Sequence, residues 1–170
     1  VGSEMCIRDS MDTRLPSIFR TVADKLGPGH SEAIYQKATS LLLTDASISH
    51  HCEYHVPVTF SFETASSSAT VEYNIGDERI DILTYDTQGR IHVIELKAAQ
   101  NTLCPANVRT SETTHATIAP PAHVQAMKYI RLLETQRTHP PVASAFVVNF
   151  RQTVRFQTQK LNVEIDYYDN

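Results

Sequence analysis

The sequence predicts an α/β fold in which a mixed β-sheet is flanked by α-helices. Two segments near its start carry apolar residues at helical spacing, and several strand-like segments follow them. A third helical segment separates a predicted β-hairpin from the last strands, an order that is typical of an α/β sandwich. With 170 residues, of which 41% are hydrophobic, the chain is long enough for one core and short for two. We therefore expect a single domain.

The first ten residues are treated apart from that domain. Residues 1–10 show no helical or strand periodicity, and they resemble a peptide that arises when sequencing-adapter bases are translated in frame. A disordered native tail is the alternative. We expect the domain to span residues 11–170, with Met11 as a candidate start.

Two helices are expected before the first strand. The first ends at Gly27-Pro28-Gly29, and its apolar positions are Leu15, Ile18, Phe19, Val22 and Leu26. The second begins after Ser31, which can cap it, and runs to about Asp45, with an expected apolar stripe at Ile34, Ala38, Leu41 and Leu42. Glu32 lies in the first turn, where a carboxylate suits the positive end of a helix. Position alone therefore leaves electrostatic capping and a site role equally open for Glu32.

The central strands lead into a hairpin that carries unexpected charges. Residues 51–63 read as a strand with an edge position favoured by Pro57, and 70–73 as a short strand before Gly76. Residues 79–83 and 91–97 then form two apolar strands around a turn at 87–90. Residues two apart share a face of a strand, so Glu95 and Lys97 continue an apolar row. Buried charges must be paired, placed in a cleft or bound to a metal.

The second half of the chain is expected to alternate loop, helix and strands. Residues 100–120 are polar and contain two prolines, which indicates either a functional or a disordered loop. A helix is expected from Pro121, with Ala126, Met127, Ile130 and Leu133 facing inward and Gln125 and Tyr129 one turn apart on an adjoining face. Residues 142–150, 152–157 and 161–168 read as strands.

Three motifs in this order resemble the PD-(D/E)XK nuclease superfamily. Asp81 is followed, after thirteen residues, by Glu95-Leu96-Lys97, which resembles the core motif of that superfamily. Upstream, Gly29, Glu32 and Tyr35 are similar to the Gly-x-x-Glu-x-x-Tyr signature of one of its branches. Downstream, Gln125-Ala126-Met127-Lys128-Tyr129 is similar to the Gln-x-x-x-Tyr helix of nucleases that accompany helicases. The resemblance implies a restriction-endonuclease-like core.

The resemblance also implies a role for each motif residue. Asp81 and Glu95 would bind a metal, Leu96 would lend its main-chain carbonyl, and Lys97 would orient water or stabilise the transition state. Glu32 would support a second metal or position the first through water, and Gln125 and Tyr129 would lie beside the phosphate. Hard oxygen ligands favour Mg²⁺ or Mn²⁺ over zinc.

Each of these assignments has an alternative in which the residue has only a structural role. Asp81 and Lys97 can form an ion pair across the hairpin while Glu95 is exposed at an edge, and surface pairs of that kind contribute little. Gln125 can be a solvated helix residue, and Tyr129 a core aromatic with its hydroxyl at the rim. We favour the metal site, because the strand before Glu95 is apolar on both faces.

These residues predict a metal-dependent nuclease that acts on DNA, although RNA and small phosphoesters stay open. The alternative is a catalytically silent module of the same fold that binds nucleic acid or a protein partner. The net charge of −4 gives no global attraction to phosphate, so a protein partner would help to hold the substrate. Three unpaired-looking cysteines and the lack of a membrane-spanning apolar run predict an intracellular protein, cytoplasmic or nuclear, with no membrane contact.

Overall fold

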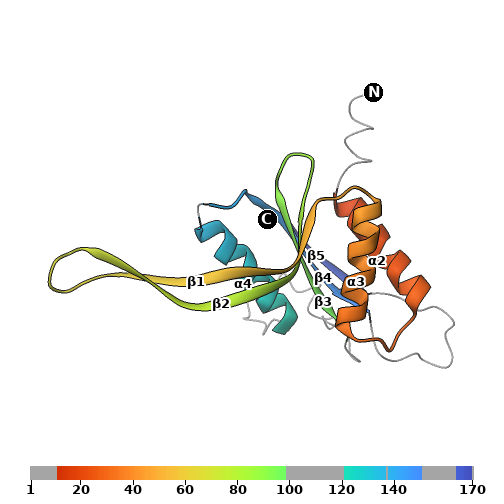
Figure 1. Cartoon of the computed structure of the whole chain (residues 1–170), viewed down its shortest axis with the longest axis horizontal. Helices are drawn as coiled ribbons and strands as arrows, with labels where there is room; N and C mark the ends of the chain where they lie inside the picture. The colour runs from red at the N-terminus through yellow and green to blue at the C-terminus, as the bar shows by residue number, and fades with distance from the viewer. Residues whose placement is uncertain (1–10, 99–120, 137, 151–163, 170) are drawn as a thin grey trace, which may run out of the picture.

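The computed structural model describes residues 11–98, 121–136, 138–150 and 164–169. Three helices and five strands occur in this part of the chain (Figure 1). Their order is α2 (Met11–Leu26), α3 (Glu32–Asp45), β1 (His50–Glu63), β2 (Thr70–Tyr85), β3 (Ile91–Lys97), α4 (Pro121–Thr135), β4 (Val142–Asn149) and β5 (Glu164–Asp169). The predictions for residues 1–10, 100–120 and 152–157 lie outside the described residues.

The strands form one five-stranded sheet in the order β1-β2-β3-β4-β5. Neighbouring strands are antiparallel except β3 and β4, which are parallel. A parallel pair needs a crossover, and α4 lies between these two strands in the chain. The predicted mixed sheet is confirmed, and β1 has the edge position that Pro57 indicated.

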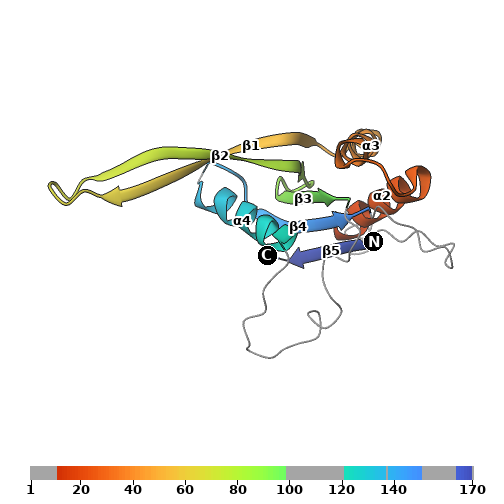
Figure 2. The ribbon, with the colours of Figure 1, turned by 90° about the horizontal axis from the view of Figure 1, so that it is seen from below.

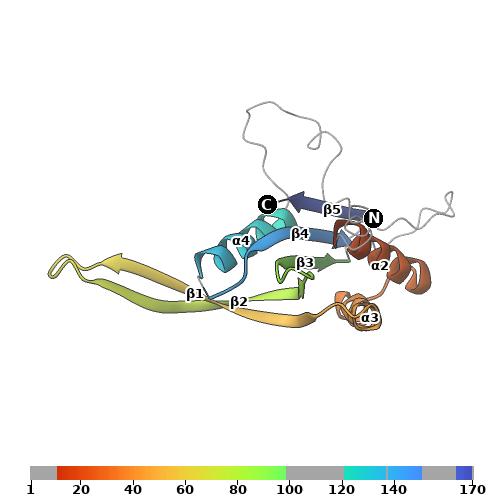
Figure 3. The ribbon, with the colours of Figure 1, turned by 90° about the horizontal axis from the view of Figure 1, so that it is seen from above.

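Helices cover both faces of the sheet. On one face, α2 and α3 pack over a cluster that includes Phe19, Tyr35, Ile94 and Phe146. On the other, α4 packs over Val93, Val147 and their neighbours. Figures 2 and 3 show α4 and the α2–α3 pair at different parts of the sheet. Strand β3 is buried at six of its seven positions, because both of its faces are covered.

The predicted apolar stripe of α3 is confirmed at Ala38 and Leu42, which pack partly buried against the core, and is wrong at Ile34 and Leu41. The buried residues of this helix are Tyr35, Thr39 and Leu43, whereas Ile34 and Leu41 are 46% and 65% exposed. The hydroxyl of Tyr35 donates to the Gly27 carbonyl (2.7 Å), so an aromatic with a polar tip replaces the expected aliphatic contact. Ser31 occupies the N-cap position without a side-chain capping bond.

The predicted short strand at 70–73 is also incorrect, because β2 runs without a break from Thr70 through Gly76 to Tyr85. The register between β1 and β2 shifts once, between Val58 and Thr59, which leaves one extra residue on β2 as in a β-bulge. The two outer halves of β1 and β2 form a long ribbon that extends beyond the helices (Figures 1 and 2). We call residues 57–78 the arm.

Helix α4 begins at Pro121 as predicted, but the face that it buries is different. Ala126 and Leu133 are buried as expected, whereas Met127 is 59% exposed. His123 and Tyr129 take inward positions instead, at 3% and 1% exposure. An amphipathic reading that counts only aliphatic residues misses buried aromatic and imidazole rings whose polar atoms find partners.

Candidate active site

The candidate site lies at the end of β3, where an otherwise apolar strand carries Glu95 and Lys97. The antiparallel register pairs Ile82 with Ile94, so Asp81 of β2 lies across the hairpin from Glu95. One oxygen of Asp81 accepts a hydrogen bond from the Leu96 amide at 2.7 Å. The hairpin therefore brings the two predicted acidic residues and the lysine to the same end of the sheet.

Glu95 is the most unusual of these groups, because its carboxylate is almost fully buried at 1% exposure. Its Oε1 atom pairs with the Lys97 ammonium at 2.8 Å. Its Oε2 atom has no hydrogen-bond partner among the described residues. Burial, followed by the charge of Asp81, raises the pKa of Glu95 to about 7. An unsatisfied buried carboxylate oxygen is costly, and such groups are typical of sites that receive a ligand.

The pKa values of Asp81 and Lys97 are also shifted in this site. Burial is also the largest cause that raises the pKa of Asp81, and it outweighs the Leu96 amide and Lys97, which lower it. For Lys97, burial acts to lower the pKa, but the hydrogen bond to Glu95 and the surrounding carboxylates raise it overall. Lys97 is therefore a persistent cation at the mouth of the site, with 27% of its side chain exposed.

Glu32 reaches this group from a helix on a different part of the fold. Its Oε1 atom accepts a hydrogen bond from the Ala98 amide at 3.2 Å, which links the start of α3 to the residue after Lys97. Its charge also raises the pKa values of Asp81 and Glu95, although more weakly than burial does. The structure thus brings Glu32 to the hairpin charges, beyond what helix capping alone requires.

Tyr129 connects α4 to the same hairpin. Its hydroxyl receives a hydrogen bond from the Gln125 amide at 2.7 Å and donates one to the Arg79 carbonyl at 2.6 Å. Burial raises the pKa of Tyr129 to about 12, so the hydroxyl stays protonated. Tyr129 is 1% exposed, which agrees with a core aromatic that presents a polar tip. Gln125 and Tyr129 act as one hydrogen-bonded pair.

The purely structural alternative, an Asp81–Lys97 ion pair with an exposed Glu95, is wrong. Lys97 pairs with Glu95 instead, and Glu95 is buried. The reason is spacing, since residues 95 and 97 project from the same face of one strand.

Sequence reasoning also missed Asn149, a fully buried residue that lies in register with Lys97 on β4. A polar residue at the end of the apolar run 142–148 was the available signal.

A ready-made cluster of three metal-ligating side chains does not occur within the described ranges. Asp81 and Glu32 each direct an oxygen to a backbone amide, and Glu95 directs one to Lys97. Carboxylates that face one another without a cation repel, so these alternative partners are expected. The chemistry of the donors and the unsatisfied Glu95 oxygen nevertheless fit a hard divalent cation.

Two comparisons with known proteins relate this chain to other sequences and structures. A model of the PD-(D/E)XK nuclease superfamily matches residues 9–111, which include Glu32, Asp81, Glu95 and Lys97. The crystal structure of SSO0001 is similar over 81% of this chain and 50% of that chain, at 14% sequence identity and a TM-score of 0.41. The chain thus spans about half the length of SSO0001. No curated protein matches the chain.

Proposed function

We propose that this chain, which belongs to the PD-(D/E)XK nuclease superfamily, is a metal-dependent nuclease that hydrolyses phosphodiester bonds in DNA. Its sheet with helices on both faces is the restriction-endonuclease-like architecture expected for that superfamily. The observation that carries the proposal is the buried Glu95 carboxylate, with one oxygen unsatisfied, beside Asp81 and Lys97.

Asp81 and Glu95 would hold Mg²⁺ or Mn²⁺, with the Leu96 main-chain carbonyl as a third ligand and Glu32 as a support for a second ion. When bound, the cation supplies a nucleophilic water and neutralises charge that develops on the phosphate. A raised pKa of Glu95 means that cation binding must displace a proton near neutral pH. We therefore expect cation affinity to rise between pH 6 and pH 8.

Lys97 is assigned the role of a phosphate or water ligand. Its ammonium is positive at neutral pH and partly exposed, so it can donate to a phosphate oxygen at the mouth of the site. If Glu95 held a cation, its ion pair with Lys97 would weaken, and the Lys97 ammonium would be able to donate to substrate. Gln125 would lie beside the phosphate, and Tyr129 is a positioning residue that holds Gln125 against β2.

We further propose that the chain belongs to the branch named for the Gly-x-x-Glu-x-x-Tyr signature. Tyr35 supports this assignment, because its hydroxyl bonds to the Gly27 carbonyl and its ring stacks on Phe150 at 4.4 Å. These contacts fix the turn from which Glu32 starts α3. In this reading the tyrosine of the signature positions its glutamate.

Cleavage of labelled DNA tests the proposal. Single-stranded and duplex DNA and RNA are incubated with Mg²⁺, Mn²⁺ or chelator, and DNA cleavage in the presence of metal is the expected result. Glu95→Gln should remove it while the fold is retained, as measured by circular dichroism. Asp24→Asn, an exposed change on α2, is the matched control and should cleave normally.

The alternative is a silent module that keeps this fold and binds nucleic acid or a protein partner. The absence of a preformed three-ligand cluster in the described part of the chain favours it. The discriminating result would be metal-independent DNA binding without cleavage of any substrate, unaffected by Glu95→Gln. That outcome would replace the enzymatic proposal.

A further inference from the structure

Strands β2 and β3 stop pairing just before the residues of the candidate site. Their last paired residues are Ile82 and Ile94, and beyond them the two strands carry the site carboxylates. Counted on from that pair, the same register places Arg79 of β2 level with Lys97 of β3. The candidate site thus lies in a fork between two strands, with one cation on each side of its mouth.

Arg79 combines a fixed backbone with an exposed guanidinium. Its carbonyl accepts a hydrogen bond from the Tyr129 hydroxyl at 2.6 Å, and that hydroxyl also receives one from Gln125. Its side chain is 59% exposed, and its Nη1 atom pairs with Oε2 of Glu53 at 2.6 Å. A guanidinium carries more N–H donors than this contact uses, so it can also bind a phosphate.

Glu53 holds that contact from a strained backbone position. Its φ of 55° lies in the left-handed region, although the residue is inside β1. The other non-glycine residues with positive φ in the described ranges, Ser47 and Ser68, lie between elements. Strain of this kind costs folding free energy and persists mainly at functional sites. An exposed ion pair contributes little stability in return, so stability alone does not account for Glu53.

Glu53 also acts on the candidate site itself. Burial is the largest cause that raises the pKa of Asp81, and the charges of Glu32 and Glu53 raise it further. The Glu53 side chain is 41% exposed, so the core does not require it. Glu53 therefore adds negative charge near a site that already repels phosphate, and it neutralises the one cation of β2.

We propose that Arg79 binds a phosphate of the nucleic-acid substrate, and that Glu53 occupies its guanidinium until this phosphate displaces it. This role rests on the proposed nuclease function. The sugar-phosphate backbone crosses the fork between Arg79 and Lys97, which brings the scissile phosphate over Asp81 and Glu95. Because an exposed ion pair contributes little, a phosphate that Lys97 also holds can displace Glu53.

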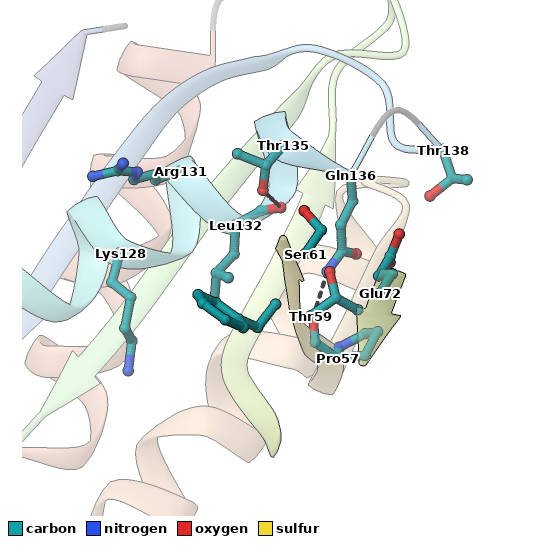
Figure 4. A pocket seen from close by; sticks show the side chains of 11 residues that line it. Pro57, Thr59, Ser61, Glu72, Lys128, Arg131, Leu132, Thr135, Gln136 and Thr138 are labelled. Atoms are coloured by element: carbon teal, nitrogen blue, oxygen red, sulfur yellow. Dashed lines mark hydrogen bonds between the residues drawn. The ribbon is translucent and has the colours of Figure 1, made fainter. Parts of the chain in front are cut away.

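Two cations of α4, Lys128 and Arg131, offer the other path for a phosphate. They line a pocket of about 760 Å³ where α4 meets the arm (Figure 4). Lys128 is paired with Glu78 at 2.9 Å, and Glu72 belongs to the same lining. Within the described part of the chain, no contact links this pocket's Arg131 to the carboxylates of the candidate site. Arg131 is therefore the matched control, an exposed guanidinium beside the sheet but outside the fork.

Binding of a labelled single-stranded DNA oligonucleotide, followed by fluorescence anisotropy with Ca²⁺ in place of Mg²⁺, tests the role of Arg79. Ca²⁺ prefers the same oxygen ligands. Arg79→Gln should raise the Kd at least about tenfold, because a hydrogen bond between charged groups is lost. Arg131→Gln should leave the Kd near the wild-type value. A loss in Arg79→Gln no larger than that in Arg131→Gln overturns the proposal.

Glu53→Gln tests the other half of the pair and should change the affinity in the opposite direction. The Kd should fall by about two- to fivefold, the worth of an exposed ion pair, because Arg79 is set free. Glu63→Gln, an equal change of charge at the exposed end of β1, is the matched control and should bind as the wild type does. No gain beyond that of Glu63→Gln, or a large fall in Tm in both Glu53→Gln and Arg79→Gln, would make the pair structural.

The double variant, Glu53→Gln with Arg79→Gln, shows whether Glu53 acts through Arg79. Its Kd should equal that of Arg79→Gln alone, since Glu53 then has no guanidinium to release. If the two effects add instead, Glu53 changes the affinity only through net charge, and the proposed displacement is wrong.

Cleavage of the same oligonucleotide with Mg²⁺ separates this proposal from the proposed function. Arg79→Gln should raise KM at least about tenfold and change kcat little, because Arg79 binds away from the reacting bond. A wild type that cleaves, with KM unchanged in Arg79→Gln, overturns only the role of Arg79. A wild type that binds DNA in the expected pattern but cleaves none overturns the nuclease and keeps that role. A wild type that neither binds nor cleaves DNA overturns both.

Discussion

The two ends of β3 both bury polar side chains, but only one end satisfies them. At the start of the strand, His92 contacts the Ser144 hydroxyl at 2.5 Å and Asp86 at 3.1 Å. Asp86 also accepts hydrogen bonds from the amides of Gln88 and Arg90 and from the Arg90 side chain, each at 2.9 Å. Burial acts to raise the pKa of Asp86, but these donors outweigh it and lower the pKa. This end is an internally complete network.

The opposite end leaves a carboxylate oxygen without a partner. Glu95 has a pKa raised to about 7, and Asp81 and Glu32 add further negative charge around it. Folding alone would favour a neutral residue here, as the apolar positions before it show. The comparison indicates that the His92 end stabilises the hairpin, whereas the Glu95 end retains a conflict that a cation would resolve.

The largest expected difference between the ends is in catalysis. Asp81→Ala and Lys97→Ala should each lower metal-dependent cleavage by at least about 10²-fold, because each removes a group assigned to the metal or the phosphate. Asp86→Asn should leave the cleavage rate per folded molecule near that of the wild type. Rates of DNA cleavage measure both, with the folded fraction taken from circular dichroism. An equal loss of cleavage rate in Asp86→Asn would contradict the assignment of catalysis to the Glu95 end alone.

The second difference is in folding stability, where we expect substitutions at the His92 end of β3 to be the more damaging ones. His92→Ala should lower the free energy of unfolding by about 2–4 kcal/mol, because it removes a buried ring together with its hydrogen bonds to Ser144 and Asp86. Denaturant unfolding at neutral pH measures this loss. Lys97→Ala should cost less, since Lys97 is partly exposed. If Lys97→Ala proved the more destabilising change, the Glu95 end would be structural.

The third difference concerns pH. The pKa of Glu95 rises from an ordinary 4.5 to about 7 on folding, so the folded protein binds the extra proton between these values. Its stability contribution is therefore present below pH 4.5 and is lost as pH rises through 7. Asp86 has a lowered pKa, so its contribution is present at neutral pH and is lost only in acid.

Glu95→Gln isolates that effect. Without metal, the variant should lose less stability than the wild type between pH 5 and pH 8, by about 1–3 kcal/mol. Added Mg²⁺ should stabilise the wild type at pH 8 and leave the variant unchanged. Thermal unfolding at both pH values provides the measurement. Identical dependence of stability on pH in the two proteins would mean that folding does not raise the pKa of Glu95.

The same comparison explains which features the sequence could reveal. The hairpin and its charged end were predictable, because strand alternation places Glu95 and Lys97 on one face whatever surrounds them. The buried faces of α3 and α4 were predictable only in part, at positions such as Leu42 and Ala126. The hydroxyls of Tyr35 and Tyr129 are buried against distant carbonyls, those of Gly27 and Arg79, which the sequence could not specify. Such contacts depend on the tertiary fold.

The choice between Asp81 and Glu95 as the partner of Lys97 shows the same limit at the site. The sequence places all three charges close together and is compatible with either pairing. Only the structure shows that Lys97 pairs with Glu95 and that the second carboxylate oxygen of Glu95 has no partner among the described residues. Within the described residues, no helix is both long enough and apolar enough to cross a bilayer.

The smallest expected effect separates positioning from stability. Tyr129→Phe removes the hydrogen bonds to Gln125 and to the Arg79 carbonyl, and Thr84→Val removes one to the His92 carbonyl at the opposite end. Each should cost about 1 kcal/mol of stability, because each breaks buried hydrogen bonds. Only Tyr129→Phe should also lower the cleavage rate, by about three- to tenfold, because Gln125, which we propose lies beside the phosphate, then loses its anchor.

Gln125→Ala completes this test, since it should reproduce the loss of rate caused by Tyr129→Phe, and the double variant should lose no more than either single one. Steady-state cleavage measured alongside denaturant unfolding separates the two effects. Additive losses would mean that Gln125 and Tyr129 act independently, with Tyr129 serving only the core. A loss of rate in Thr84→Val as large as that in Tyr129→Phe would show that cleavage follows hairpin stability, whichever end is disturbed.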